Sequence, residues 1–149
     1  MDFREFEAFV QDNLDLLQGV HPESEDELAK YEAALGFPLP KSMKWLLSTH
    51  GYSMACGVEN LDGSVRITEE CRKNIQLPKN VLIINDWNDG GVVFAVAGDQ
   101  PDAEYEIVWG DAADVHQLSE GKPPHSENER FKGFAEWVAD RVQFEKNNG

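Results

Sequence analysis

The chain has 149 residues, the size of one domain, and its 41% apolar content is sufficient for a hydrophobic core. Thirteen Lys and Arg residues against twenty-eight Asp and Glu residues give a net charge of −15, which argues against binding to nucleic acid or anionic membranes. No apolar run approaches the ~20 residues of a membrane-spanning helix, and the N-terminal segment lacks the order of a signal peptide. We therefore expect a cytoplasmic protein in which Cys56 and Cys71 are free thiols in or near the core.

Four helices are predicted from apolar residues that recur every three or four positions. They cover residues 3–18, 25–35, 40–51 and a last helix that starts after Ser126. Capping boxes are expected where a Ser or Asp precedes a Glu by three residues: Asp2 with Glu5, Ser24 with Glu27, and Ser126 with Glu129. Trp137 lies off the apolar stripe of the last helix, so we expect it to be partly exposed. A further short helix over residues 69–75, capped by Thr68, is compatible with the sequence.

The middle of the chain is predicted to form strands at residues 64–68, 81–84, 92–97 and 105–110. The wholly apolar run 81–84 is typical of a central strand. The alternation in 105–110 predicts a strand with one packed face, including Trp109, and one solvated face. Short connections favour antiparallel pairing. We therefore predict an α+β fold, with N-terminal helices packed on a central antiparallel β-sheet and a closing C-terminal helix, as one domain over residues 1–149.

The segment 85–91, Asn-Asp-Trp-Asn-Asp-Gly-Gly, concentrates oxygen-bearing side chains as a metal loop would. An EF-hand counted from Asp86 needs an oxygen ligand at its fifth position, where this chain has Gly90, and the glutamate at the twelfth position is also missing. Asp89 and Gly90 between two apolar strands instead predict a hairpin turn. Such a turn can still bind a partner through an exposed Trp87.

Other patterns of catalytic and metal-binding residues are missing from the sequence. The four histidines and two cysteines are scattered without the spacing of zinc ligands, and no nucleophile elbow or phosphate-binding loop is found. We therefore predict a non-enzymatic protein with no catalytic residue, no metal and no cofactor. A small enzyme that uses Asp86 or Asp89 is the remote alternative.

The segment from Asn80 to Gly121 contains nine acidic residues and no Lys or Arg. A surface that serves solubility alone normally mixes both signs of charge, whereas a one-signed segment favours a partner of the opposite charge. The sequence therefore predicts a basic protein partner. The candidate partner-binding residues are Asp86, Trp87, Asp89, Asp99, Asp102, Glu104, Glu106 and Asp111.

Residues 24–53 resemble the signature of the SUKH superfamily (Smi/Knr-type). The matching positions are Leu35, Gly36, Leu39, Pro40, Trp45, Leu46, Leu47, His50 and Gly51. The segments 85–96, 108–115 and 131–142 are similar to later parts of the family pattern. The resemblance covers about residues 20–145 and leaves the helix over 3–18 as an extra N-terminal element.

The resemblance implies an α+β domain without known catalytic residues, in which the signature positions are structural. Bacterial members of the superfamily are immunity proteins that neutralise polymorphic toxins, many of them nucleases, and fungal members regulate cell-wall assembly and signalling. Our hypothesis is an immunity protein that binds a basic toxin domain through its acidic surface. An interaction adaptor in cell-wall assembly or signalling is the alternative.

Overall fold

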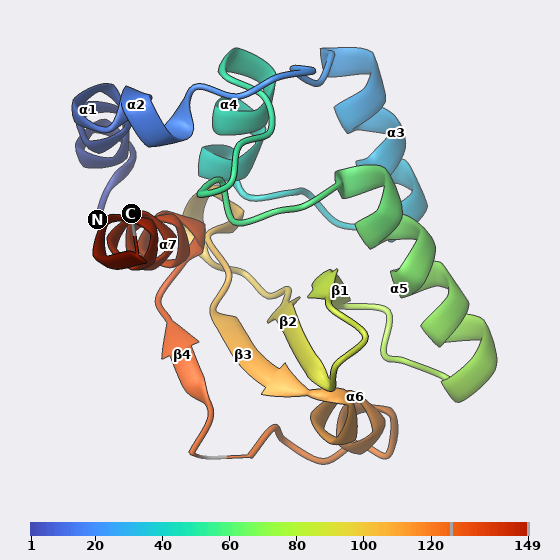
Figure 1. The fold of residues 1–149 in the computed structure, drawn as a ribbon. Helices are drawn as coiled ribbons and strands as arrows, with labels where there is room; N and C mark the ends of the chain where they lie inside the picture. The colour runs from blue at the N-terminus through green and yellow to red at the C-terminus, as the bar shows by residue number, and fades with distance from the viewer. Residues whose placement is uncertain (126, 149) are drawn as a thin grey trace.

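The computed structural model describes residues 1–125 and 127–148, which form an α+β fold as predicted (Figure 1). Helices make up the N-terminal half: α1 (Phe3–Asp12), α2 (Leu14–Leu17), α3 (Glu25–Leu35), α4 (Lys41–Thr49) and α5 (Leu61–Ile75). The remaining elements are β1 (Val81–Asp86), β2 (Gly91–Val96), the 3-10 helix η1 (Pro101–Ala103), β3 (Ile107–Asp111), α6 (Ala112–Ser119), β4 (Glu129–Phe131) and α7 (Phe134–Asn148). The amino group of Met1 pairs with Glu136 in the first turn of α7 at 2.6 Å, which ties the start of the chain to the last helix.

The predicted capping box at the start of α1 is confirmed. The one at the start of α3 is confirmed only in part. The Asp2 carboxylate accepts the Glu5 amide at 2.8 Å, and the Glu5 carboxylate accepts the Asp2 amide at 3.0 Å. Ser24 Oγ accepts the Glu27 amide at 3.1 Å, whereas the Glu27 carboxylate pairs with a lysine instead of reaching back. Asn13 divides the helix predicted over residues 3–18 into α1 and α2.

The strands form an antiparallel sheet in the order β1-β2-β3-β4, and β1 and β2 form the predicted hairpin. Both faces of the sheet are packed, so the prediction that one face of 105–110 is solvated is wrong. On one face, the main core packs the five helices from α1 through α5, together with α7, against Leu82, Ile84, Val93, Ala95 and Ile107. A second core on the other face joins α6 to Val81, Ile83, Val92, Phe94 and Val108.

The strand predicted over residues 64–68 is wrong, because these residues lie inside α5. The helix begins after Asn60, whose side chain accepts the Gly63 amide at 2.9 Å, so Thr68 is not its cap. The buried face of α5 consists of Leu61, Ser64, Val65 and Thr68, at helical spacing. Two of these four positions are polar, so apolar residues alone do not reveal the helical period.

The polar residues of α5 bind the outer edge of β1. Ser64 Oγ donates to the Ile84 carbonyl at 2.6 Å, and Thr68 Oγ1 accepts the Ile83 amide at 2.9 Å. Strand β1 is therefore an edge strand, not the central strand that its apolar run predicts. Its residues are buried because α5 covers the edge and satisfies backbone groups that would otherwise be free to pair with another chain.

Replacing Thr68 by valine is expected to lower the free energy of unfolding by about 1–3 kcal/mol, because the Ile83 amide then stays buried without an acceptor. Urea denaturation measures this loss. Hydrogen exchange of the Ile83 amide should become fast in Thr68→Val and stay slow in Thr68→Ser, which keeps the hydroxyl. Equal protection of this amide in both variants would contradict the bond between α5 and β1.

The last helix begins later than predicted. Residues 129–131 form β4, which pairs with β3 and places Glu129 opposite Trp109, and α7 starts only at Phe134. Glu129 therefore takes no part in a capping box, and Ser126 lies outside the described residues. Phe131 lies in β4, before the helix begins, and packs on Trp137 of α7 with ring centroids 5.1 Å apart.

Candidate functional site

Three tryptophans from separate elements meet at one side of the sheet. Trp87 follows β1, Trp109 lies in β3 and Trp137 lies in α7. The ring centroids are 5.8 Å apart both between Trp87 and Trp109 and between Trp109 and Trp137, with edge-to-face geometry. Gly91 in β2 lies directly beside the first two rings, since a Cβ there would stand 3.4 Å from Trp87 and 3.8 Å from Trp109, at ordinary van der Waals contact.

Trp137 forms the floor of this cluster and is fully buried, so the prediction that it is partly exposed is wrong. Its indole Nε1 donates to the Gly57 carbonyl at 2.9 Å. Trp137, Arg141 and Phe144 follow one another at spacings of four and three, and they form a second stripe along α7 beside the apolar one. This spacing can be read from the sequence, and it is the signal that could have identified these three residues as one face of the helix.

Arg141 is held between aromatic rings above this floor. Its guanidinium carbon lies 4.8 Å from the ring centroid of Trp109, 4.6 Å from that of Trp137 and 4.9 Å from that of Phe144. Its Nη2 also pairs with the Asp140 carboxylate at 2.8 Å. Stacking on ring faces and an ion pair together hold the arginine in one place.

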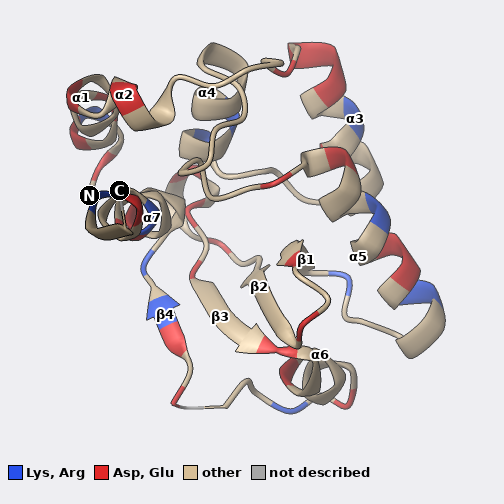
Figure 2. Ribbon diagram, in the orientation of Figure 1, with Lys and Arg blue, Asp and Glu red and all other residues tan. Residues whose placement is uncertain are grey.

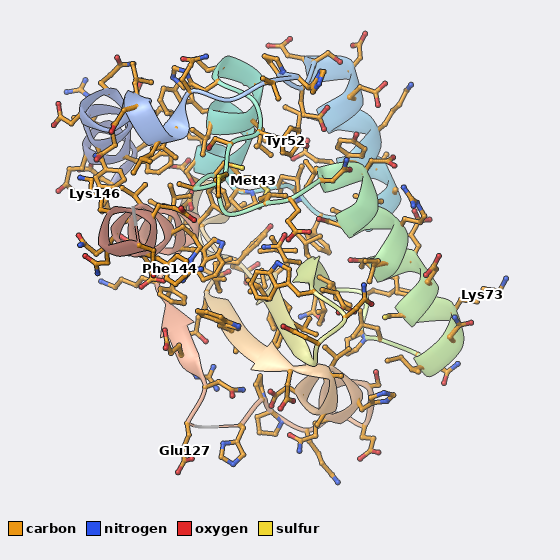
Figure 3. The ribbon with its side chains drawn as sticks, in the orientation of Figure 1. Met43, Tyr52, Lys73, Glu127, Phe144 and Lys146 are labelled. Carbon is orange, nitrogen blue, oxygen red and sulfur yellow. The ribbon has the colours of Figure 1, made fainter. Side chains whose placement is uncertain are left out.

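The described residues expose four large apolar side chains, and two of them border this cluster. Met54 is 85% exposed and Phe144 is 48% exposed, and Figure 3 shows Phe144 at the edge of α7. Trp87 and Trp109, both half-buried, lie between them. We refer to Met54, Trp87, Trp109 and Phe144 as the tryptophan face.

Two pockets of about 280 Å³ each open on the tryptophan face, with Arg141 between them. The first lies between Met54, Trp87 and α7, and it is bordered by the carboxylates of Glu59 and Glu145. The second lies between Trp109 and Phe144, and it is bordered by Glu129 and Asp140. The apolar face therefore has an acidic rim on both sides.

The predicted partner-binding residues do not form one cluster. Asp86, Trp87 and Asp89 belong to the β1–β2 turn, and Asp111 is brought beside this turn because it pairs with Gly91. Asp99, Asp102, Glu104 and Glu106 precede β3 and lie toward the opposite end of the sheet. In Figure 2 the elements from β1 to α6 carry no Lys or Arg, as the sequence requires.

Several of these acids also have structural partners. Asp86 and Asp89 each accept an amide two residues further on, at 3.0 and 2.9 Å, which shapes the turn. Glu104 accepts both the amide and the hydroxyl of Ser42 at 2.9 Å, at the start of α4. Glu106 pairs with Arg130 at 2.7 Å. Part of the acidity of this segment therefore serves the fold.

Comparison with protein families matches residues 22–140 to the SMI1 / KNR4 family (SUKH-1). The chain belongs to this family. None of the curated proteins matches the chain. Domains of the SUKH family are generally non-enzymatic, and membership is consistent with an immunity-type or cell-wall-related domain. Helices α1 and α2 precede the matched residues.

The SUKH signature positions pack around α3 and α4, and none of them lines the two pockets of the tryptophan face. Leu35, Leu39, Leu46 and Leu47 are buried in the main core. Gly36 ends α3 with φ of 87°, which an L side chain rarely adopts. In this chain the signature positions lie around α3 and α4, whereas the tryptophan face is built by the β1–β2 turn, β3 and α7.

No helix among residues 1–125 and 127–148 has the length and hydropathy that crossing a membrane requires. Within the same residues, no three His, Cys, Asp or Glu side chains come together as ligands for a metal ion. Cys56 and Cys71 are free, as predicted, with Cys56 buried and Cys71 half-buried.

Asp114 in α6 is a buried carboxylate with two backbone donors. Its oxygens accept the His125 amide at 3.0 Å and the Asp111 amide at 2.9 Å. Burial opposes the charge, but these donors outweigh it and lower the pKa of Asp114 below its ordinary value of 3.8. The carboxylate ties the loop before β4 to the start of α6, beside the β1–β2 turn.

Replacing Asp114 by asparagine is expected to lower the free energy of unfolding by about 1–3 kcal/mol at neutral pH, because one amide donor then faces an NH₂ group. A folded-state pKa below the unfolded value gives stability that is present above 3.8 and is lost as the pH falls through the folded pKa. The difference between the wild type and Asp114→Asn should therefore shrink at acid pH.

Urea denaturation at pH 7 and at about pH 3 measures this change in the effect of Asp114→Asn. Asp111→Asn is the matched control, because the Asp111 side chain accepts one amide, that of Asp114 at 3.1 Å, which asparagine accepts equally well. A difference that is the same at both pH values would show that the Asp114 charge is unimportant.

Proposed function

We propose that this protein is an immunity protein that neutralises a cognate basic toxin domain, of nuclease type, by binding it through the tryptophan face and the acids around it. The exposed apolar side chains beside an acidic rim carry this proposal. Exposed apolar clusters on a protein surface mark interaction sites, and tryptophan and arginine are enriched among the residues that dominate binding energy. Family membership supports it, because the family is consistent with immunity-type domains.

Each part of the surface has a separate role in this proposal. The acids of the rim and the β1–β2 turn attract a basic partner and raise the association rate, since complementary potentials steer the encounter. Trp87 and Phe144 then lose water on contact and supply most of the affinity. The bound protein covers the basic surface with which a nuclease holds its anionic substrate.

Co-expression with candidate basic nuclease toxin domains tests the proposal. The wild type should restore growth and form a complex whose affinity falls as the salt concentration rises. Trp87→Ala should weaken the complex at least ~30-fold, because hot-spot residues contribute about 2 kcal/mol or more. Growth assays and calorimetry measure the two effects.

Trp45→Ala is the matched control for Trp87→Ala. Trp45 is also half-buried and in edge-to-face contact with other rings, but it lies among Phe3, Phe6 and His50 on the α1–α4 side. The control should bind the toxin with unchanged affinity once its stability has been verified by denaturation. Undiminished protection by Trp87→Ala would show that the toxin does not use this face.

The adaptor in cell-wall assembly or signalling is the second candidate, and the family supports it equally as a class. Recovery of a scaffold or kinase, instead of a toxic domain, in a pull-down with the wild-type protein would favour it. The acidity of the segment 80–121 favours the immunity role, because it suits a partner that itself binds a polyanion.

A further inference from the structure

The first pocket of the tryptophan face has the size and lining of a site for one side chain. Its volume of about 280 Å³ lies just below the ~300–1,000 Å³ of pockets that bind small molecules. Met54, Val58 and the Trp87 ring form apolar walls, and Glu59 and Glu145 place two carboxylates at the border. An occupant therefore needs an apolar stem and a positively charged end.

The two carboxylates come from different elements and are held differently. Glu59 Oε1 accepts the indole N–H of Trp87 at 2.6 Å, which fixes its carboxylate beside the ring and leaves the other oxygen free. The Glu59 amide also donates to Asn85 at 3.0 Å, so its backbone is tied to β1. Glu145, from α7, also lines the pocket. This arrangement suits a planar cation that donates in two directions.

The protein itself shows how a guanidinium fits here. Arg141, which separates the two pockets, lies over three ring faces and pairs with Asp140. Its own charge is matched by Asp140, so Glu59 and Glu145 are available for a second cation. A guanidinium has the planar shape to stack on an indole ring while donating to two carboxylates, whereas an ammonium lacks this planar fork.

We propose that this pocket receives a single arginine side chain of the basic partner, stacked on Trp87 and donating to Glu59 and Glu145. The inference rests on the proposed function, because the arginine belongs to the basic partner that is proposed to bind the tryptophan face. Arg141 forms the wall between this pocket and the next, and it orients the aromatic rings rather than competing for the carboxylates.

Titration of the 149-residue chain with the peptide N-acetyl-Gly-Arg-Gly-amide tests this pocket without any toxin. The indole N–H signal of Trp87, assigned with Trp87→Phe, should move in a saturable way by NMR. The same peptide with citrulline in place of arginine keeps the shape without the charge and should cause no shift. Glu145→Gln should weaken the response to the arginine peptide at least tenfold, and Glu120→Gln, at the remote C-terminal end of α6, should leave it unchanged.

An equal response to both peptides, no response to either, or an unchanged response in Glu145→Gln would overturn the arginine site. These outcomes are distinct from failure of the proposed function. Protection against the toxin without peptide binding contradicts the pocket alone, whereas peptide binding without protection supports the pocket and contradicts the immunity role.

Discussion

Replacing Trp137 by alanine is expected to lower the free energy of unfolding by about 3–5 kcal/mol, a large part of the ~5–15 kcal/mol of an ordinary domain. The side chain is fully buried, and it touches Trp109, Phe131 and Arg141. Its loss leaves a cavity beneath the tryptophan face and removes the donor to the Gly57 carbonyl. Thermal and urea denaturation measure the change.

Trp137→Phe separates these two contributions. Phenylalanine keeps an aromatic ring on Phe131 and Arg141 but cannot donate to the Gly57 carbonyl, so we expect a smaller loss. Phe144→Ala, on the exposed side of the same helix, should change stability by less than about 1 kcal/mol. If Trp137→Ala were no more destabilising than Phe144→Ala, Trp137 would not be the floor of this site.

Replacing Gly51 by alanine is expected to lower the free energy of unfolding by about 2–5 kcal/mol, from left-handed strain together with overpacking. Gly51 has φ of 76°, and a Cβ there would stand 2.3 Å from the carbonyl oxygen of Val20. The residue after it, Tyr52, pairs with Val20, so neither backbone segment can move away without losing this bridge. Urea denaturation measures the loss.

Gly36→Ala is the control for Gly51→Ala. Gly36 also has a positive φ, of 87°, but no atom lies within 4 Å of a Cβ built there. Its replacement should therefore cost only the left-handed strain, about 1–2 kcal/mol. Equal losses at the two glycines would mean that the contact with Val20 yields, and that Gly51 is required for its backbone conformation alone.

Features governed by short-range interactions were predictable from the sequence. The capping residues Asp2 and Ser24 and the Asp89-Gly90 turn depend on neighbours within a few positions, and the structure confirms each of them. The α+β fold class and the family also followed, because apolar periodicity and a local signature persist whatever the details of packing.

The candidate site was predictable only in part. Trp87 and Asp89 were identified because both lie in one conspicuous turn. Phe144 and Glu145 were missed, because a helix is needed to bring residues so distant in the chain beside that turn. The acids of the segment 80–121 were grouped by sequence proximity, whereas the sheet divides them between its two ends.

The sequence alone therefore determined the local caps and turns, the fold class, the family and the excess of negative charge. The tertiary structure decided that residues 64–68 are helical, that residues 129–131 form β4 and that Trp137 is buried. The physical reason is the same in each case. Hydrogen bonds between α5 and β1, the pairing of β4 with β3 and the packing of Trp109 on Trp137 all join residues that are far apart in the chain, and such contacts override local preference.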